Sequence, residues 1–413
     1  MRTEGHTNQR RRDTADLAIL VYDLRASGVV VNALRIAGAA RAAGMTVELW
    51  LTADHGPLRS SVPPGITVRT LTAPSAALPR GLRSAMALPR LAGLIRRRRP
   101  RILLSSGNHV HAFACIAHLI AGVKGVQLIG RASNALAAVV PPKRMGLLGR
   151  LARRAAMVIE KWQYRRMDRI VSVSAELTGH LATFAGTSPD KLRTIPNGVD
   201  LAAIESKAAE PADHPWFEHG APPVLLAVGR LSRQKNFAQL IRAFALLRRF
   251  RDARLVIIGA GDAAESSALA ALASELGIAD DVWLAGYQDN PYRFMARASL
   301  FVLSSRWEGA SNVLIEALAC GCPVVATDCP TGVREIIQDH APAFLVPLDD
   351  VGGMAMAMQA GLHRPLDRHA ARRRAADFSL TRSLAAYVAV LREGLHPDDP
   401  RTAGPSPQLV FGA

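Results

Sequence analysis

The stretch Glu308–Glu316 reads E-G-A-S-N-V-L-I-E and is followed at once by A-L-A-C-G-C-P-V-V-A-T at positions 317–327. This pattern predicts a loop that carries one carboxylate, a short helix that begins at Ser311 or Asn312 and carries the second, and then a buried strand. Both acids can project toward the start of that helix, because eight residues make little more than two turns. The unpaired N–H groups at a helix start favour a diphosphate, and the carboxylates suit neutral sugar hydroxyls.

Strand-like runs alternate with helical runs through most of the chain, which indicates parallel sheets in an α/β protein. Helices are expected between the strands, for example at 31–43, 110–121, 237–250 and 263–276. The expected strands are Leu17–Leu24, Thr46–Leu51, Ile102–Ser106, Val126–Gly130, Arg169–Val173, Val224–Val228, Arg254–Ile258, Val282–Ala285, Leu300–Leu303 and Pro323–Ala326.

A chain of 413 residues is long enough for two domains. The Pro- and Gly-rich segment 206–223 is the expected linker. We therefore predict two Rossmann-like, doubly wound domains that face a central cleft with the carboxyl ends of their strands, where such sheets bind ligands. The predicted ranges are a disordered N-terminal extension at 1–13, an N-terminal domain at 14–205, a C-terminal domain at 206–378, a C-terminal helix at 379–397 that packs back toward the N-terminal domain, and a disordered tail at 398–413.

The composition excludes several classes of protein. Four cysteines are too few and too clustered for a disulfide framework, and Cys320 and Cys322 lack partners at the spacing of a zinc finger. The sequence contains no apolar run of about 18 residues that would span a membrane. Its polar N-terminus lacks the apolar core of a signal peptide, so a cytoplasmic protein is expected.

The net charge of +17 lies in the first half of the chain. Residues 1–200 hold 30 Lys and Arg against 11 Asp and Glu, whereas residues 201–413 hold 21 against 23. Residues 143–169 hold nine of these cations and repeat apolar residues at helical spacing, from Leu148 to Trp162. A basic amphipathic helix can lie on an anionic membrane surface, or its apolar stripe can pack on the domain core. A nucleic-acid partner is disfavoured, because aromatic residues make up only 5% of the chain.

Two further segments join a strand to a helix. Gly229–Phe237, G-R-L-S-R-Q-K-N-F, places Arg230 and Lys235 where a phosphate would meet the next helix. Ile257–Asp262, I-I-G-A-G-D, allows close backbone approach at Gly259 and Gly261, although the full dinucleotide pattern is absent. Pro196–Asp200, P-N-G-V-D, is a turn by composition, and its position before the expected linker suggests a structural role.

Together with V-W-L-A-G-Y at 282–287, these segments resemble the retaining GT4 glycosyltransferases of the GT-B fold over roughly 169–337. The resemblance implies that the N-terminal domain binds the acceptor and the C-terminal domain binds a nucleotide sugar. Gly229, Gly259 and Gly261 would allow the donor to approach. Arg230 and Lys235 would clamp its diphosphate, and the N–H groups of Ser311, Asn312 and Val313 would complete the cradle. Glu316 would bind the ribose, and Glu308 would lie near the transferred sugar.

The acceptor half matches the family less closely. Gly28 stands alone where the family often has a pair of glycines. His109 or His111 would face the donor sugar, and the sequence does not choose between them; a histidine without a ligand is the alternative. Arg131 and Asn134 follow the next strand and could contact the acceptor or its phosphate, or pair with a carboxylate.

The resemblance thus predicts a retaining glycosyltransferase of cell-envelope polysaccharide or glycolipid synthesis. It would move a hexose or N-acetylhexosamine from a nucleotide sugar, expected to be UDP-linked, to a lipid-linked or glycan acceptor at the inner face of the cytoplasmic membrane. No D-x-D pair is present to hold Mg²⁺ or Mn²⁺, so the cations would stabilise the leaving diphosphate without a metal. The alternatives are an epimerase or phosphorylase on the same fold, or a non-catalytic membrane- or nucleic-acid-binding protein.

Overall fold

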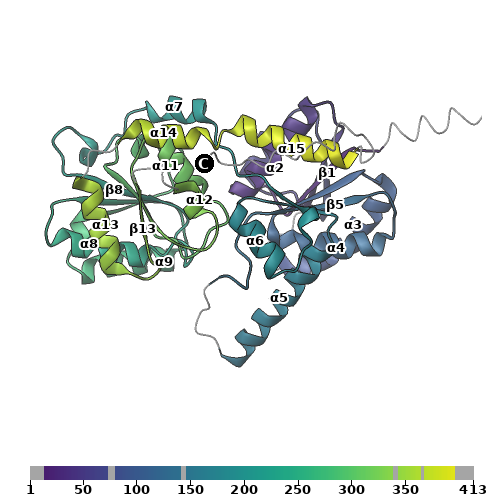
Figure 1. Ribbon diagram of the computed structural model, residues 1–413, viewed down its shortest axis with the longest axis horizontal. Coiled ribbons are helices and arrows are strands. Elements are labelled where there is room, and N and C mark those ends of the chain that lie inside the picture. Colours follow the sequence, from purple (N-terminus) through teal and green to yellow (C-terminus); the bar gives the residue numbers. More distant parts are fainter. Residues whose placement is uncertain (1–13, 73–79, 141–145, 338–342, 364–366, 396–413) are drawn as a thin grey trace, which may run out of the picture. The chain divides into compact units, whose positions relative to one another are not determined.

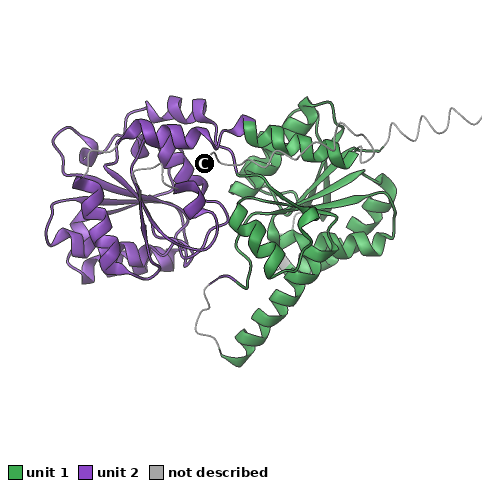
Figure 2. Ribbon diagram, in the orientation of Figure 1, with its two compact units in different colours: residues 1–138, 144–196, 382–413 green, residues 139–143, 197–381 purple. Residues whose placement is uncertain are grey.

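The computed structural model describes residues 14–72, 80–140, 146–337, 343–363 and 367–395. The chain divides into two compact units (Figure 2). Unit 1 comprises residues 1–138, 144–196 and 382–413, and unit 2 comprises residues 139–143 and 197–381. The predicted disordered segments, 1–13 and 398–413, lie outside the described residues.

Unit 1 is built on a sheet of seven strands in the order β3-β2-β1-β4-β5-β6-β7, and every pairing is parallel. The strands are β1 (Leu17–Val21), β2 (Val47–Ala53), β3 (Thr67–Thr72), β4 (Ile102–Ser106), β5 (Gln127–Ala132), β6 (Arg169–Ser172) and β7 (Leu192–Thr194). The helices are α2 (Gly28–Ala42), α3 (Arg80–Arg98), α4 (Asn108–Ala121), α5 (Leu147–Arg166), α6 (Ala175–Thr183) and most of α15 (Leu380–Leu395).

The C-terminal helix α15 belongs to the core of unit 1. Its buried residues join those of α2 and the central strands in one hydrophobic cluster. The Tyr387 hydroxyl accepts a hydrogen bond from Arg131 Nε at 2.9 Å, and Glu393 pairs with Arg169 at 2.6 Å. Helix α15 therefore completes the first unit rather than the second.

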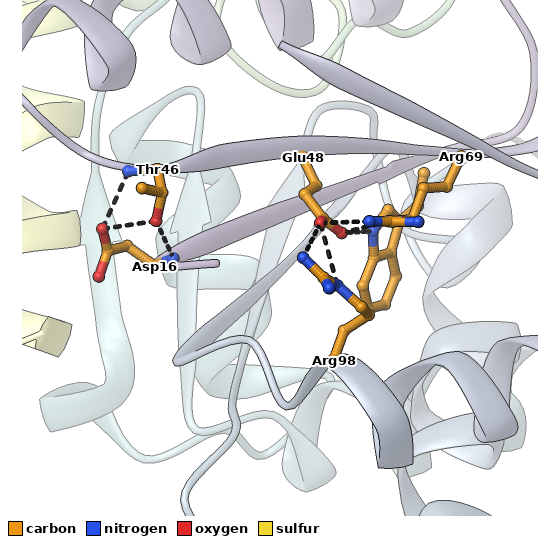
Figure 3. A network of polar contacts seen from close by, with 6 residues as sticks. Asp16, Thr46, Glu48, Arg69 and Arg98 are labelled. Atoms are coloured by element: carbon orange, nitrogen blue, oxygen red, sulfur yellow. Dashed lines mark hydrogen bonds and ion pairs between the residues drawn. The ribbon is translucent and has the colours of Figure 1, made fainter. Parts of the chain in front are cut away.

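One edge of this sheet is fixed by a buried carboxylate, Glu48 on β2 (Figure 3). It accepts hydrogen bonds from Arg69 Nε on β3 at 2.8 Å, from Arg98 on α3 at 2.7 Å and from Trp50 Nε1 at 2.8 Å. Burial alone would raise the pKa of the Glu48 carboxyl, but these hydrogen bonds outweigh it and hold the pKa below its ordinary value. The network ties the edge strand and the end of α3 to the centre of the sheet.

Unit 2 has a six-stranded parallel sheet in the order β10-β9-β8-β11-β12-β13. Its strands are β8 (Val224–Val228), β9 (Arg254–Ile258), β10 (Val282–Gly286), β11 (Leu300–Leu303), β12 (Val324–Thr327) and β13 (Ala343–Val346). The helices are α7 (Leu201–Ala208), α8 (Phe237–Arg248), α9 (Ala263–Glu275), α10 (Tyr292–Met295), α11 (Asn312–Ala319), α12 (Val333–Ile337), α13 (Val351–His363) and α14 (Arg368–Ala376). Short 3₁₀ turns, two in each unit, lie at Pro57–Ser61, Pro189–Lys191, Pro215–Phe217 and Ala279–Asp281.

The chain passes from unit 1 to unit 2 at Pro196–Asn197, not in the predicted linker 206–223. Much of that segment is ordered within unit 2: it includes the end of α7 and the Pro215–Phe217 turn, and His214 stacks on Trp283 of β10 with ring centroids 4.0 Å apart. The Pro and Gly residues of segment 206–223 therefore belong to a loop that packs against the edge strand β10. The chain returns from unit 2 to unit 1 after residue 381, and the segment before this return is hydrogen-bonded to the segment after Pro196–Asn197. Val199 N–H donates to Phe378 O and Leu380 N–H donates to Val199 O, both at 2.9 Å.

Helix α5 leaves most of its length exposed. Only Gln163 and Tyr164 near its end are buried, and α5 extends beyond the rest of unit 1 (Figure 1). The apolar side chains of Leu148, Leu151 and Val158 are exposed by 83%, 50% and 65%. The stripe therefore does not pack on the core of unit 1, which removes one of the two interpretations of this helix. Among the described residues, no helix is both long and apolar enough to cross a membrane.

Candidate active site

In unit 2 the direction of winding reverses between β8 and β11. From β8 the chain adds β9 and β10 on one side, and it then returns to add β11, β12 and β13 on the other. The loops that leave the carboxyl ends of β8 and β11 part at this point, where open parallel sheets bind ligands. One loop carries Gly229–Asn236 and the other carries Ser304–Ser311, so both sequence motifs meet at the switch point.

The predicted glycines bring the ends of β8 and β9 together. Gly229 N–H donates to Ile258 O at 2.9 Å, and Leu231 N–H donates to Ala260 O at 2.9 Å. Gly259 has a φ of +154°, and a Cβ there would lie 1.8 Å from Gly229 O. Glycine is thus required by backbone packing between two neighbouring loops, whether or not a ligand also approaches them.

Lys235 and Glu308 form an ion pair across the switch point. Lys235 Nζ donates to Glu308 Oε1 at 2.6 Å, and only 15% and 8% of the two side chains are exposed. Ser305 Oγ donates to the same carboxylate oxygen at 2.6 Å. The second oxygen, Oε2, has no hydrogen-bond donor among the described residues, so it can accept from a ligand hydroxyl.

The backbone around this pair is also fixed. Arg306 N–H donates to Gln234 O at 2.8 Å, and Gln234 Nε2 donates to Trp307 O at 2.9 Å, which links the two loops on either side of the pair. The loop after β12 holds Glu308 itself: Glu308 N–H donates to Pro330 O at 3.2 Å, and the Thr331 hydroxyl donates to Glu308 O. Sequence reasoning assigned no role to Ser305, Gln234 or Thr331, because the role of each depends on a partner in a different part of the chain or on a contact that only the fold creates.

Arg230 lies in the loop after β8 with an exposed side chain. No hydrogen bond or ion pair joins its guanidinium to another described residue. A cation left unpaired beside the switch point is available to an anionic ligand, and guanidinium can bind two phosphate oxygens at once. The two predicted cations therefore differ: Lys235 is already neutralised, and Arg230 is not.

Helix α11 begins without a side-chain cap. Ser311 is the N-cap residue, but its hydroxyl is buried and has no hydrogen-bond partner within the described residues. The first N–H groups of the helix, including those of Asn312 and Val313, are thus left for an external acceptor. Asn312 Oδ1 accepts a hydrogen bond from Asn197 Nδ2 at 2.8 Å, which connects the P-N-G-V-D turn to this helix start.

Glu316 lies one turn further along α11 and is half-buried. Its Oε1 accepts a hydrogen bond from the Tyr292 hydroxyl at 3.4 Å. Tyr292 begins α10, which lies between β10 and β11 in the chain and packs against α11. The two glutamates therefore have different partners: Glu308 pairs with Lys235, and Glu316 accepts from Tyr292 on α10. The expectation that both project toward the start of α11 stays a prediction.

In unit 1 the corresponding reversal lies between β1 and β4, and the structure separates the two candidate histidines there. His109 is exposed, and its ring makes an edge contact with Tyr22, which follows β1, at 5.9 Å between centroids. His111 is fully buried; its Nδ1 hydrogen-bonds Ser105 Oγ at 2.8 Å. Burial lowers the pKa of His111 to about 3, so it is a neutral core residue. The catalytic prediction for His111 is corrected, and of the two only His109 can contact a ligand.

The structure also alters the predicted acceptor residues. Arg131 is 1% exposed and hydrogen-bonds Tyr387, so its position in the core corrects the prediction that it contacts an acceptor. Gly28 is the exposed first residue of α2 and follows the N-cap Ser27. Asn134 stays half-exposed, and its carbonyl accepts from Asn108 Nδ2 at 3.2 Å. Asn108, to which the sequence reasoning assigned no role, therefore holds the backbone of Asn134 in place.

The described residues contain no group of three or more His, Cys, Asp or Glu that could hold a metal ion. All four cysteines are free and buried. The prediction that no metal takes part in the reaction stays a prediction.

Two family models match the chain. Glycosyltransferase Family 4 matches residues 26–203, and Glycosyl transferases group 1 matches residues 222–364, so together they cover most of the sequence. The chain belongs to the GT4-type glycosyltransferases. The two parallel-sheet units are those of the GT-B fold. The GT4 motifs identified above, from Pro196 to Thr327, lie partly in each matched region.

This GT4-type chain is similar to several known proteins. It is 38% identical, over 48% of its length and 52% of the relative's, to the Campylobacter jejuni N-acetylgalactosamine-N,N'-diacetylbacillosaminyl-diphospho-undecaprenol 4-alpha-N-acetylgalactosaminyltransferase. It is 33% identical, over 41% and 47%, to the lipopolysaccharide core biosynthesis glycosyltransferase LpsE of Rhizobium meliloti. These matches span about half the length of the curated relatives.

Solved structures share the fold at low sequence identity. The structure of Anabaena Alr3699/HepE in complex with UDP and glucose has a TM-score of 0.72 and 17% identity, with 93% of this chain and all of that one covered. The structure of WaaG, a glycosyltransferase involved in lipopolysaccharide biosynthesis, has a TM-score of 0.71 and 18% identity, with coverage of 91% and 99%.

Proposed function

We propose that the protein is a retaining, metal-independent glycosyltransferase that moves a hexose or N-acetylhexosamine from a UDP-linked donor to a lipid-linked or glycan acceptor in cell-envelope synthesis. Family membership supports glycosyl transfer. The names of the relatives, which act on a diphospho-undecaprenol glycan and in lipopolysaccharide core synthesis, support the class of acceptor. The observation that carries the proposal is the arrangement at the switch point of unit 2: Arg230, the Lys235–Glu308 pair and the uncapped start of α11.

Each of these groups has a role in the proposed reaction. As the bond from the anomeric carbon to the diphosphate breaks, negative charge builds up on the leaving UDP. Arg230, Lys235 and the α11 N–H groups would stabilise that charge in place of a divalent ion. Glu316 would accept hydrogen bonds from the ribose, and Glu308 Oε2 would accept one from the sugar. We assign the removal of the acceptor's proton to the departing phosphate, because no side chain at the site stands out as a base.

The test is turnover with a panel of nucleotide sugars, chosen first by thermal stabilisation of the purified protein, because a ligand that binds only the folded state raises its Tm. Arg230→Ala should lower kcat by about 10²-fold or more, since one charge-stabilising donor is lost. Arg242→Ala, an exposed arginine on α8, is the matched control. Full activity of the Arg230 variant at saturating donor would refute the site. Loss of turnover with a chelator, and its recovery with Mn²⁺, would refute metal independence.

Two further measurements settle the finer points. NMR of the product's anomeric proton distinguishes retention from inversion. Incubation with donor alone tests the epimerase alternative, because an epimerase interconverts its nucleotide sugar without an acceptor, whereas a transferase requires one.

We also propose that α5 binds the anionic surface of a membrane. Its exposed stripe of Leu148, Leu151 and Val158 would enter the interface while the cations that surround it face lipid headgroups, each contributing about 1 kcal/mol. A lipid-linked acceptor would then be presented to unit 1 at the membrane.

Sedimentation with vesicles tests this proposal. Vesicles that contain anionic lipid should bind the protein, and neutral vesicles should bind it much more weakly. Leu148→Ser combined with Val158→Ser should weaken binding, while Phe250→Ser should not, because Phe250 is an equally exposed side chain (78%) on unit 2. Equal binding of both variants would contradict a role for α5.

A further inference from the structure

Thr331 has a backbone conformation that its side chain disfavours. Its φ is +71°, in the left-handed region, and the residue is completely buried. Four non-glycine residues of the described chain have positive φ, and Thr331 is the one with a β-branched side chain. Such residues rarely adopt this conformation unless the surroundings enforce it, and they concentrate at functional sites.

The chain could have avoided this strain with a glycine, which adopts positive φ freely. Gly332, the next residue, does so with a φ of +79°. The presence of threonine at 331 therefore requires an explanation, and the hydrogen bond of its hydroxyl provides one. That hydroxyl donates to the carbonyl of Glu308, while Glu308 N–H donates to the carbonyl of the preceding residue, Pro330, at 3.2 Å.

The loop after β12 thus forms hydrogen bonds with both backbone polar groups of Glu308, its N–H and its carbonyl. Ser305 and Lys235 hold one oxygen of its carboxylate, each at 2.6 Å, and leave Oε2 available. With the main chain and one carboxylate oxygen fixed, the direction of the other oxygen is determined. Without the Thr331 hydroxyl, one of the two backbone anchors is lost and the carboxylate can shift.

We propose that Thr331 is a positioning residue for sugar transfer: its left-handed backbone directs the hydroxyl onto Glu308, and this contact sets the Glu308 carboxylate against the donor sugar. The proposal rests on the proposed function, in which Glu308 contacts that sugar. A displacement of about 1 Å at such a group can reduce the rate by about 10²-fold, although the residue that moved it touches no substrate.

Thr331→Gly gives the sharpest test, because it removes the hydroxyl and relieves the backbone at the same time. We expect the urea midpoint of unfolding to stay the same or rise, while kcat falls by about tenfold or more and the affinity for UDP changes by less than about twofold. Thr331→Ser keeps the hydroxyl and should retain kcat within about twofold. A purely structural residue would lose stability and activity together.

The matched control is Thr72→Val in unit 1, where a buried threonine hydroxyl donates to the carbonyl of Thr52 at 2.5 Å. It should alter the unfolding midpoint and leave kcat unchanged. Wild-type kcat in Thr331→Gly overturns the inference, and so does a loss of kcat in Thr331→Ser equal to that in Thr331→Gly. If the wild type neither binds UDP nor uses any nucleotide sugar, it is the proposed function that fails.

Discussion

Replacement of Glu308 by Gln should separate nucleotide binding from sugar transfer. In the structure Lys235 is neutralised by Glu308, at 2.6 Å. A diphosphate that approaches Lys235 must share that ammonium with the carboxylate and must also tolerate the carboxylate's negative charge. Glu308→Gln removes the competing charge but keeps an amide oxygen to accept from Lys235 and Ser305. We therefore expect the variant to bind UDP more tightly and yet to transfer sugar more slowly.

The size of the effect follows from the burial of the pair. Two unit charges about 4 Å apart attract by about 4 kcal/mol at an effective dielectric constant of about 20, and desolvation offsets much of this. With side-chain exposures of 15% and 8%, screening by solvent is limited. If about 1 kcal/mol of the released interaction reaches the bound nucleotide, the Kd for UDP falls about fivefold. The nucleotide-free variant should be less stable than the wild type, and UDP should recover part of the difference.

Isothermal titration of UDP into wild type and Glu308→Gln, at one fixed ionic strength, measures the change in Kd, and kcat is measured in parallel with the chosen donor. Glu275→Gln is the control, because it removes an exposed carboxylate at the end of α9 in the same unit. Weaker or unchanged UDP binding by Glu308→Gln would show that the pair does not compete with the nucleotide, and the reasoning above would be wrong.

Three other predictions follow from contacts outside the Lys235–Glu308 pair. Asn197→Ala removes the hydrogen bond to Asn312 at the start of α11 and should weaken UDP binding, measured by titration, about threefold to tenfold. An unchanged affinity would show that the P-N-G-V-D turn does not contribute to nucleotide binding. Glu48→Gln should lower the free energy of unfolding in urea by about 2–4 kcal/mol at pH 7. Because the pKa of Glu48 is depressed in the folded state, that deficit should shrink as the pH falls below about 4.5, and a constant deficit would contradict the assignment. The pKa of His111 is lowered to about 3, so the unfolded chain alone takes up this proton below about pH 6.5. Stability should therefore fall as the pH drops from there, and His111→Gln should show a smaller fall in chemical denaturation.

The sequence predicted the α/β class and the central strands of both sheets because these strands are apolar and buried on both faces. It missed β3, β7 and β13. All three are edge strands, and the first is partly exposed along Thr67–Thr70. An edge strand needs fewer apolar residues, so periodicity gives a weaker signal there. The linker was misplaced for a related reason: Pro and Gly mark any irregular segment, whereas the crossing at Pro196–Asn197 is short and stabilised by pairing with Phe378–Leu380.

The motifs also indicated the two loops of the candidate site without showing how these loops meet. Lys235 and Glu308 are 73 positions apart, and their contact depends on β8 and β11 being neighbours in the sheet. The order of strands in a sheet depends on the whole domain, so it cannot be predicted from a local sequence pattern. His109 and His111 illustrate the same limit at short range. They are two positions apart on one helix, so their side chains point in different directions, and His111 is the one that packs against Tyr164 and hydrogen-bonds Ser105.

Thr331 is the residue that local reasoning was least able to find. Its identity disagrees with its backbone conformation, and a propensity argument would favour glycine at this position. The disagreement becomes informative only when the partner of the hydroxyl is known, and that partner, Glu308, lies on a different loop. A residue that costs stability where a better-fitting one exists must contribute something other than stability. The positive φ makes Thr331 unfavourable for the fold, and the hydroxyl contact with Glu308 connects it to the proposed chemistry of the site.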